Sequence, residues 1–132
     1  MITVHTSTPR IEAAMARYNI KNSTAIQVGD LIMFSGLTGL DLETGQPIEG
    51  GTAEQARHTL GIFADILDDL DLTLDHVVKV NAHLTNLEDF AAWNEVFLDV
   101  FDPPYPCRTT VGAPLIVGLI EIEITAATQP RR

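Results

Sequence analysis

The hydrophobic and polar positions in the first half of the chain predict two short strands followed by a helix. Residues 25–36 carry apolar side chains on both sides of a Gly-Asp pair, the composition of a tight hairpin turn. A stretch rich in turn-forming residues follows at 41–51. Thr52 then stands three residues before Gln55, the spacing of a capping box, and apolar residues recur after it with helical periodicity. We therefore expect a helix from Thr52 to about residue 69 or 70.

The second half of the chain repeats this strand and helix pattern and ends in strands. Residues 77–84 alternate, which predicts a strand with Val78, Val80, Ala82 and Leu84 on one face and Val77, Lys79, Asn81 and His83 on the other. Asn86 can cap a second helix, whose expected apolar stripe consists of Phe90, Trp93, Val96, Phe97 and Val100. Prolines at 103, 104 and 106 end that helix, and strands are expected at 108–111 and 119–126.

This order of elements predicts an α+β domain with one sheet and two helices packed on a single face. The opposite face of the sheet should then be open. It would carry polar side chains from two strands, namely Lys79, Asn81, His83, Glu121, Glu123 and Thr125. An uncovered face of mixed polarity is typical of a surface that associates with other copies of the same chain.

Composition limits the class of protein. The 132 residues form a chain of the size of one domain, which we take as 1–132. The net charge of −10 disfavours nucleic acid as a partner, because a phosphate backbone would be repelled. Neither a signal peptide nor a membrane-spanning segment is expected, so we predict no membrane partner. The single thiol, Cys107, suits a reducing compartment, and we expect a cytoplasmic protein.

Few residues suggest chemistry from the pattern alone. The four histidines show no spacing typical of metal ligands, so neither a metal nor a cofactor is expected. Cys107 and Arg108 should point to opposite faces of a strand, which predicts a packed and chemically idle thiol. Arg108 follows a proline-stiffened loop, where its planar guanidinium can bind a carboxylate through two hydrogen bonds. An ion pair with Glu121 or Glu123 is the alternative for this arginine, and both interpretations stay open.

Six collinear blocks resemble the RidA/YjgF family at about its spacing. They are VGDLIMFSG at 28–36, QAR at 55–57, DHVVKV at 75–80, LEDFAAWNEVF at 87–97, PCRTTV at 106–111 and IEIE at 120–123. The resemblance covers roughly residues 20–127. It implies a chorismate-mutase-like subunit of the Bacillus type that assembles as a homotrimer, with active sites in the clefts between subunits.

The resemblance also implies an activity and its residues. The activity is the hydrolysis of reactive enamines and imines, such as 2-aminoacrylate, to a 2-oxo acid and ammonia without a cofactor. Arg108 matches the arginine that holds the substrate carboxylate, and Glu121 the glutamate that positions or activates water. Ser35 and Gly36 match the loop whose backbone lies against the substrate, and Thr110 a position beside the water. An imine carbon is already electrophilic, so positioning, a proton and a water suffice.

The sequence departs from the family pattern at several positions. Asn22 stands where deaminating members commonly carry a tyrosine that faces the substrate, and Cys107 replaces a small alanine. His83 falls where an aromatic residue is common, and the loop between Arg108 and Glu121 is shorter than in typical members. Loss of the tyrosine ring leaves room for a bulkier 2-imino acid at Asn22, which is otherwise a simple loop-capping residue.

Two other functions compete with this prediction. One is a catabolic deaminase of an unsaturated amino acid such as an aminomuconate, with the same arginine and water. The other is a trimer that binds a 2-oxo acid at Arg108 without turnover and serves a regulatory role. A ribonuclease is disfavoured by the charge of −10 and the lack of a basic stripe.

Overall fold

The computed structural model of the protein describes residues 1–5 and 9–132. The strands are β1 (Ile2–His5), β2 (Ala25–Val28), β3 (Leu31–Phe34), β4 (Leu37–Thr38), β5 (Val77–Leu84), β6 (Cys107–Gly112) and β7 (Ile120–Ala127). The α-helices are α1 (Pro9–Arg17), α2 (Thr52–Asp69) and α3 (Phe90–Val100). Two short 3-10 helices, η1 (Leu74–His76) and η2 (Leu87–Asp89), precede β5 and α3.

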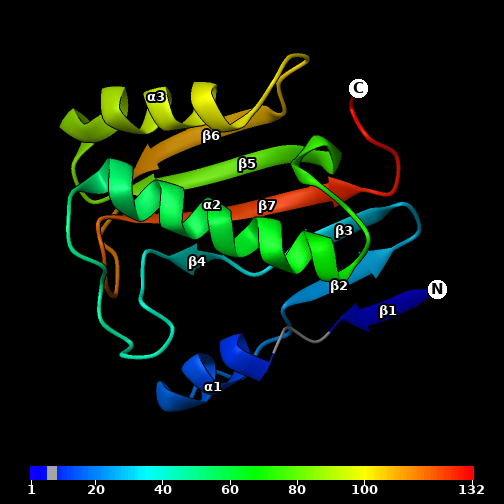
Figure 1. Ribbon diagram of the computed structural model, residues 1–132, viewed down its shortest axis with the longest axis horizontal. Coiled ribbons are helices and arrows are strands. Elements are labelled where there is room, and N and C mark those ends of the chain that lie inside the picture. The colour runs from blue at the N-terminus through cyan, green and yellow to red at the C-terminus, as the bar shows by residue number, and fades with distance from the viewer. Residues whose placement is uncertain (6–8) are drawn as a thin grey trace.

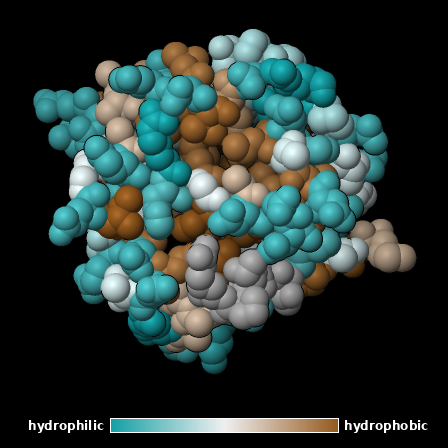
Figure 2. Space-filling model, viewed as in Figure 1, coloured by the Kyte–Doolittle hydropathy of each residue, from teal (hydrophilic) through white to brown (hydrophobic). Residues whose placement is uncertain are grey.

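The strands form one mixed sheet in the order β1-β2-β3-β7-β5-β6, with β4 also paired to β7. Only β5 and β6 run parallel among the described strand pairs, as expected for strands joined through a helix. α2 and α3 lie side by side over one face of this sheet (Figure 1). On that side hydrophilic residues surround a group of hydrophobic residues in the middle of the view (Figure 2). The predicted α+β class and the single helix-covered face are confirmed.

The expectation of only two helices was wrong, because α1 forms a third one near α2 (Figure 1). This helix has nine residues and is stabilised by tertiary burial, since Ile11 and Ala14 are 2% and 6% exposed. A helix this short has little stability of its own, and its periodic pattern is too brief to stand out in the sequence. Strands β1 and β4 were not predicted either; β1 pairs with β2, and the two-residue β4 pairs with the longer β7.

The alternation of buried and partly exposed residues along β7 shows which face of the sheet lies beneath the helices and which is open. Ile120, Ile122 and Ile124 are buried beneath the helices, whereas the glutamates between them face the opposite, open side. The predicted polar face is therefore confirmed. One detail of β5 was wrong: a shift of register between Val77 and Lys79 buries Val77 completely and leaves Val78 partly exposed.

A second irregularity lies where β3 passes into β4. Met33 pairs with Thr125, but Leu37 pairs with Ile122, so residues 34–36 oppose only residues 123–124. This is a β-bulge, in which the extra residue lets Phe34 and Leu37 both point into the core although they are three positions apart. The bulge contains Ser35 and Gly36, two of the predicted substrate-binding residues.

The predicted capping box of α2 is wrong by one residue. The helix starts after Gly51, whose N–H donates to Glu54 Oε2 at 2.8 Å. Thr52 is instead buried and donates to Asp89 Oδ2 at 2.7 Å, next to α3. Gln55 is 3% exposed, and its Oε1 accepts the N–H of Leu119 at 2.7 Å. Its amide thus tethers the loop before β7, a role that local spacing does not reveal.

Replacing Gln55 by leucine is expected to lower the free energy of unfolding by about 1–3 kcal/mol, since the Leu119 N–H would lose its acceptor away from water. Urea denaturation measures this. Gln46→Leu at an exposed position is the control and should stay within about 0.5 kcal/mol of the wild type. Equal losses in both variants would contradict a tethering role for Gln55.

Candidate functional site

Arg108 lies on the edge strand β6 and points toward α3. Strand alternation sets this direction, because Arg108 pairs with Val80, which is buried beneath the helices. The guanidinium carbon stands 4.3 Å from the centre of the Phe97 ring and 5.3 Å from that of Phe90. Both distances are within the range of cation–π attraction, so two aromatic rings of α3 fix the position of this cation.

The Arg108 guanidinium is incompletely hydrogen-bonded. Among the described residues its Nη1 is shielded from solvent and has no hydrogen-bond partner. Burial lowers the pKa of the Arg108 guanidinium below its ordinary value, although arginine keeps its charge in proteins. A buried donor without an acceptor costs about 1–3 kcal/mol. A carboxylate bound at this position would supply the acceptor and the opposite charge.

Two neighbours of Arg108 on β6 were also singled out by the sequence. Thr110 lies on the same face as Arg108, and its Oγ1 accepts the indole N–H of the fully buried Trp93 at 3.0 Å. Cys107 points to the opposite face, as predicted, but it is exposed. The prediction of a packed thiol was wrong, because β6 is the last strand of the sheet and nothing described covers its open side.

Glu121 lies on the open face, against the bulge. A Cβ atom added to Gly36 would stand 2.6 Å from Glu121 Oε1, so the carboxyl group rests directly on the glycine backbone. Any larger residue at position 36 would push the carboxyl group away. His83 of β5 is the cross-strand partner of Glu121. Glycine at the bulge thus leaves space for a carboxylate flanked by an imidazole.

The predicted site residues therefore form two groups that one chain does not bring together. Arg108 and Thr110 lie on the helix-covered side of β6, whereas Glu121 and Gly36 meet on the open side. The alternative in which Arg108 pairs with Glu121 or Glu123 is wrong for the same reason. Glu123 instead accepts a hydrogen bond from Asn81 Nδ2 at 2.9 Å.

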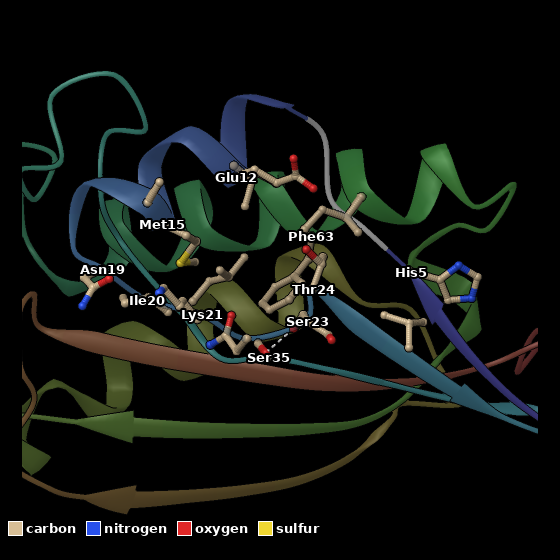
Figure 3. Close-up of a pocket in the computed structure, with 16 residues that line it drawn as sticks. His5, Glu12, Met15, Asn19, Ile20, Lys21, Ser23, Thr24, Ser35 and Phe63 are labelled. Atoms are coloured by element: carbon tan, nitrogen blue, oxygen red, sulfur yellow. Dashed lines mark hydrogen bonds between the residues drawn. The ribbon is translucent and has the colours of Figure 1, made fainter.

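A cavity of about 410 Å³ lies between α1, α2 and the start of the sheet (Figure 3). Its apolar lining consists of Val4, Ile11, Met15, Ala16, Ile20, Leu37, Phe63 and Ile66, and its polar lining of His5, Glu12, Asn19, Lys21, Asn22, Ser23, Thr24 and Ser35. Ser35 Oγ donates to the Ser23 carbonyl at 2.6 Å. Two predicted residues, Asn22 and Ser35, thus share this cavity. This cavity was not predicted, because α1, which was itself not predicted, forms one of its walls.

The described part of the chain was also searched for a metal site and for a membrane-spanning helix. No group of three or more His, Cys, Asp and Glu side chains there is arranged to hold a metal ion. Of the described helices, none combines the length and the apolar character needed to cross a membrane.

Comparison with known proteins identifies a family model, sequence relatives and solved structures that each match most of the chain. Residues 10–128 match the family model described as Endoribonuclease L-PSP. The chain is 40% identical to the mitochondrial protein mmf2 of Schizosaccharomyces pombe over 108 residues, 78% of this chain and 84% of that protein. It is 33% identical to the 2-iminobutanoate/2-iminopropanoate deaminase of Capra hircus over 126 residues, 94% of this chain and 89% of that enzyme. The crystal structure of YEO7 from yeast superposes with a TM-score of 0.84 at 28% identity, covering 98% of this chain and 100% of the other.

The molecule is thus a small α+β protein, whose described residues form one sheet and three α-helices, of the same architecture as solved members of this group. It belongs to the RidA/YjgF family, which the L-PSP family model describes. The resemblance found in the six sequence blocks is confirmed.

Replacing Thr110 by valine is expected to leave the Trp93 indole N–H without an acceptor. Because Trp93 is the single tryptophan, its fluorescence emission should shift, and the free energy of unfolding should fall by about 1–3 kcal/mol. Thr109→Val is the matched control on the open face, where Thr109 Oγ1 only accepts from Lys79 Nζ at 3.1 Å. An emission spectrum that moves equally in both variants would contradict the assigned contact.

Proposed function

We propose that the protein hydrolyses 2-imino acids and their enamine tautomers to 2-oxo acids and ammonia. The observation that carries this proposal is the Arg108 guanidinium, held on two aromatic rings with a shielded Nη1 that has no partner among the described residues. A 2-imino acid brings the carboxylate that this group lacks. Relatives named 2-iminobutanoate/2-iminopropanoate deaminase, which match up to 94% of the chain, support the same reaction.

The proposed mechanism needs only water as a second reactant. Arg108 binds and orients the substrate carboxylate, which places the imine carbon beside Glu121. Glu121 takes a proton from water as the water oxygen bonds to that carbon, and passes the proton to the imine nitrogen. The hydroxyl group of this adduct then gives up its proton, and Glu121 passes that proton to the amino nitrogen. The carbon–nitrogen bond breaks, and ammonia leaves as the carbonyl of the 2-oxo acid forms. No electrons enter or leave, so no redox cofactor is required.

The site proposed here lies between chains of a homotrimer with the chorismate-mutase-like arrangement. Arg108 and Glu121 occupy opposite faces of the sheet in one chain, so a pocket that uses both takes them from different chains. The open face supports association, because its β1–β3 half exposes a group of large apolar side chains, Ile2, Val4, Val28, Leu31 and Met33. A patch of this kind is typical of a surface that another protein covers.

The family model is described as an endoribonuclease, but the net charge of this chain disfavours a ribonuclease activity. The net charge of −10 per chain opposes binding of an RNA backbone. A small anion is different, since one desolvated arginine outweighs the general field over a few ångströms.

Arg108→Ala and Glu121→Gln are each expected to lower kcat/KM for a 2-imino acid. Loss of hydrogen bonds to a charged group predicts a decrease of roughly 10- to 100-fold for Arg108→Ala. A coupled assay, in which an amino-acid oxidase produces the imine and semicarbazide traps what remains, measures the rates.

Refolding the two variants together tests the site between chains. Mixed trimers would contain some clefts with an intact arginine and an intact glutamate, so activity should return to about a quarter of the wild-type value at random mixing. A mixture as inactive as its components would contradict the shared site. A wild type that binds 2-oxo acids but depletes no imine would favour the binding and regulatory function.

The cavity beneath α1 supports a 2-imino acid with a bulky apolar side chain as substrate. Ser35 lines this cavity, and the next residue, Gly36, touches the Glu121 carboxyl group. A substrate held at Glu121 can therefore extend its side chain past the bulge toward Met15 and Phe63, which lie on α1 and α2 (Figure 3). Asn22 at this cavity leaves space that a tyrosine ring would fill.

Asn22→Tyr is expected to narrow the substrate range. The ratio of kcat/KM for a leucine-derived imine to that for an alanine-derived imine should fall roughly 10-fold, the scale of a lost apolar contact in a pocket. Asn22→Ala keeps the space open and serves as the control, with an unchanged ratio. If alanine and tyrosine reduce the ratio equally, the amide of Asn22 acts on the substrate and its small volume is irrelevant.

A further inference from the structure

We propose that Arg131 is a positioning residue that holds Arg108 in the orientation required for carboxylate binding. This inference rests on the proposed function only in taking Arg108 as the carboxylate-binding group. Arg131 follows β7 and lies outside residues 10–128, the part of the chain that the family model matches. Two independent sets of contacts connect it to Arg108.

The first set is a cluster of hydrogen bonds to backbone carbonyl groups. Arg131 Nε donates to Pro104 at 2.7 Å, and Nη2 donates to Asp102 at 3.3 Å. Nη1 donates to Leu74 at 2.8 Å and to Val77 at 2.5 Å. The guanidinium therefore joins the proline-containing segment that leads into β6 to the start of β5, the parallel neighbour of β6.

This cluster fixes where β6 begins. Asp102 and Pro104 lie only a few residues before Arg108, so a shift of their carbonyl groups is transmitted to Arg108 along a short stretch of backbone. The side chain of Arg131 is 7% exposed, and burial lowers its pKa below the ordinary value while Asp75 and Asp102 partly oppose this. A desolvated guanidinium with several carbonyl acceptors is rigid, because moving it breaks several hydrogen bonds at once.

The second set is a row of stacked groups. The Arg131 guanidinium carbon lies 5.7 Å from the centre of the Phe101 ring. Phe101 packs on Phe97 with their ring centres 5.0 Å apart, and Phe97 carries the Arg108 guanidinium at 4.3 Å. Two cations thus bracket two packed aromatic rings. Loss of the outer cation frees Phe101 to move, and Phe97 with it, and so changes the support beneath Arg108.

Arg132 provides a matched comparison within the same chain. Its side chain is 46% exposed, and it forms ion pairs with the exposed carboxylates of Asp75 at 3.9 Å and Asp102 at 3.3 Å. Exposed ion pairs of this kind contribute little to stability. The two adjacent arginines therefore share a charge and a location but differ in burial and in contact with the aromatic row.

The test uses the full chain and the variants Arg131→Lys, Arg131→Met and Arg132→Met. Binding of 2-oxobutanoate, a product of the proposed reaction, is titrated through the fluorescence of Trp93, which is hydrogen-bonded to Thr110 beside Arg108. We expect the Kd of Arg131→Lys to rise about 5- to 10-fold, with a parallel rise in KM and kcat within about twofold, since uniform binding is lost. Arg131→Met should show the same change or a larger one, and Arg132→Met none.

A thermal melt of each variant separates positioning from stability. A lower Tm for Arg131→Lys with unchanged Kd and KM would show a purely structural role and overturn the proposal, as would equal effects of Arg131→Lys and Arg132→Met. If Arg131→Met does not fold, Phe101→Leu interrupts the aromatic row while keeping the carbonyl contacts, and the Kd of this variant should also rise.

The outcomes also separate this proposal from the proposed function. A wild type that binds 2-oxobutanoate without consuming imines refutes the proposed activity but leaves the Kd comparison valid. If Arg108→Lys leaves the Kd unchanged, Arg108 is not the anchor and the proposal fails.

Discussion

The register of β7 is the constraint on which the rest of the structure depends. This strand pairs with β3, β4 and β5, and its isoleucines alternate strictly with polar residues. A slip of one residue would turn two carboxylates toward α2 and α3 and expose three isoleucines, a cost that no local interaction offsets. Once β7 is fixed, pairing through β5 determines which side chains of β6 face the helices. The direction of Arg108 is therefore a consequence of the hydrophobic pattern of a strand two places away.

Periodicity was enough to predict the elements that contribute most to the core. The long helix α2, the helix α3 and the strands β5 and β7 each repeat their pattern over eight or more residues. The elements α1 and β4 lack such repetition and were missed, because they form only where a partner buries or pairs them. Local spacing was misleading at Gln55, where a plausible cap is in fact a buried tether. The register shift between Val77 and Lys79 could not be predicted either, since an alternating sequence does not reveal where the pairing of a strand changes register.

The residues of the candidate site were predicted from the sequence, but their arrangement in space was not. Resemblance to the family selected Arg108 and Glu121, whereas their separation onto two faces depends on strand pairing that the sequence does not display. The aromatic rings beneath Arg108 were expected only as a core stripe. Phe97 serves both purposes, because it packs against Trp93 and Phe101 and the Arg108 guanidinium lies over its ring. A residue type that strengthens the core thus also sets the electrostatics of the site.

The bulge between β3 and β4 has a consequence for how the chain can change length during evolution. β4 regains its pairing with β7 only because residues 34–36 oppose two residues of β7. Deleting one residue there would exchange the faces of Leu37 and Thr38 and draw the backbone away from Glu121. The loop at 41–51 begins a few residues later and belongs to no strand or helix. A change in its length therefore does not move side chains from one face of the sheet to the other. Insertions and deletions should therefore accumulate in that loop among related chains, while the bulge keeps its length.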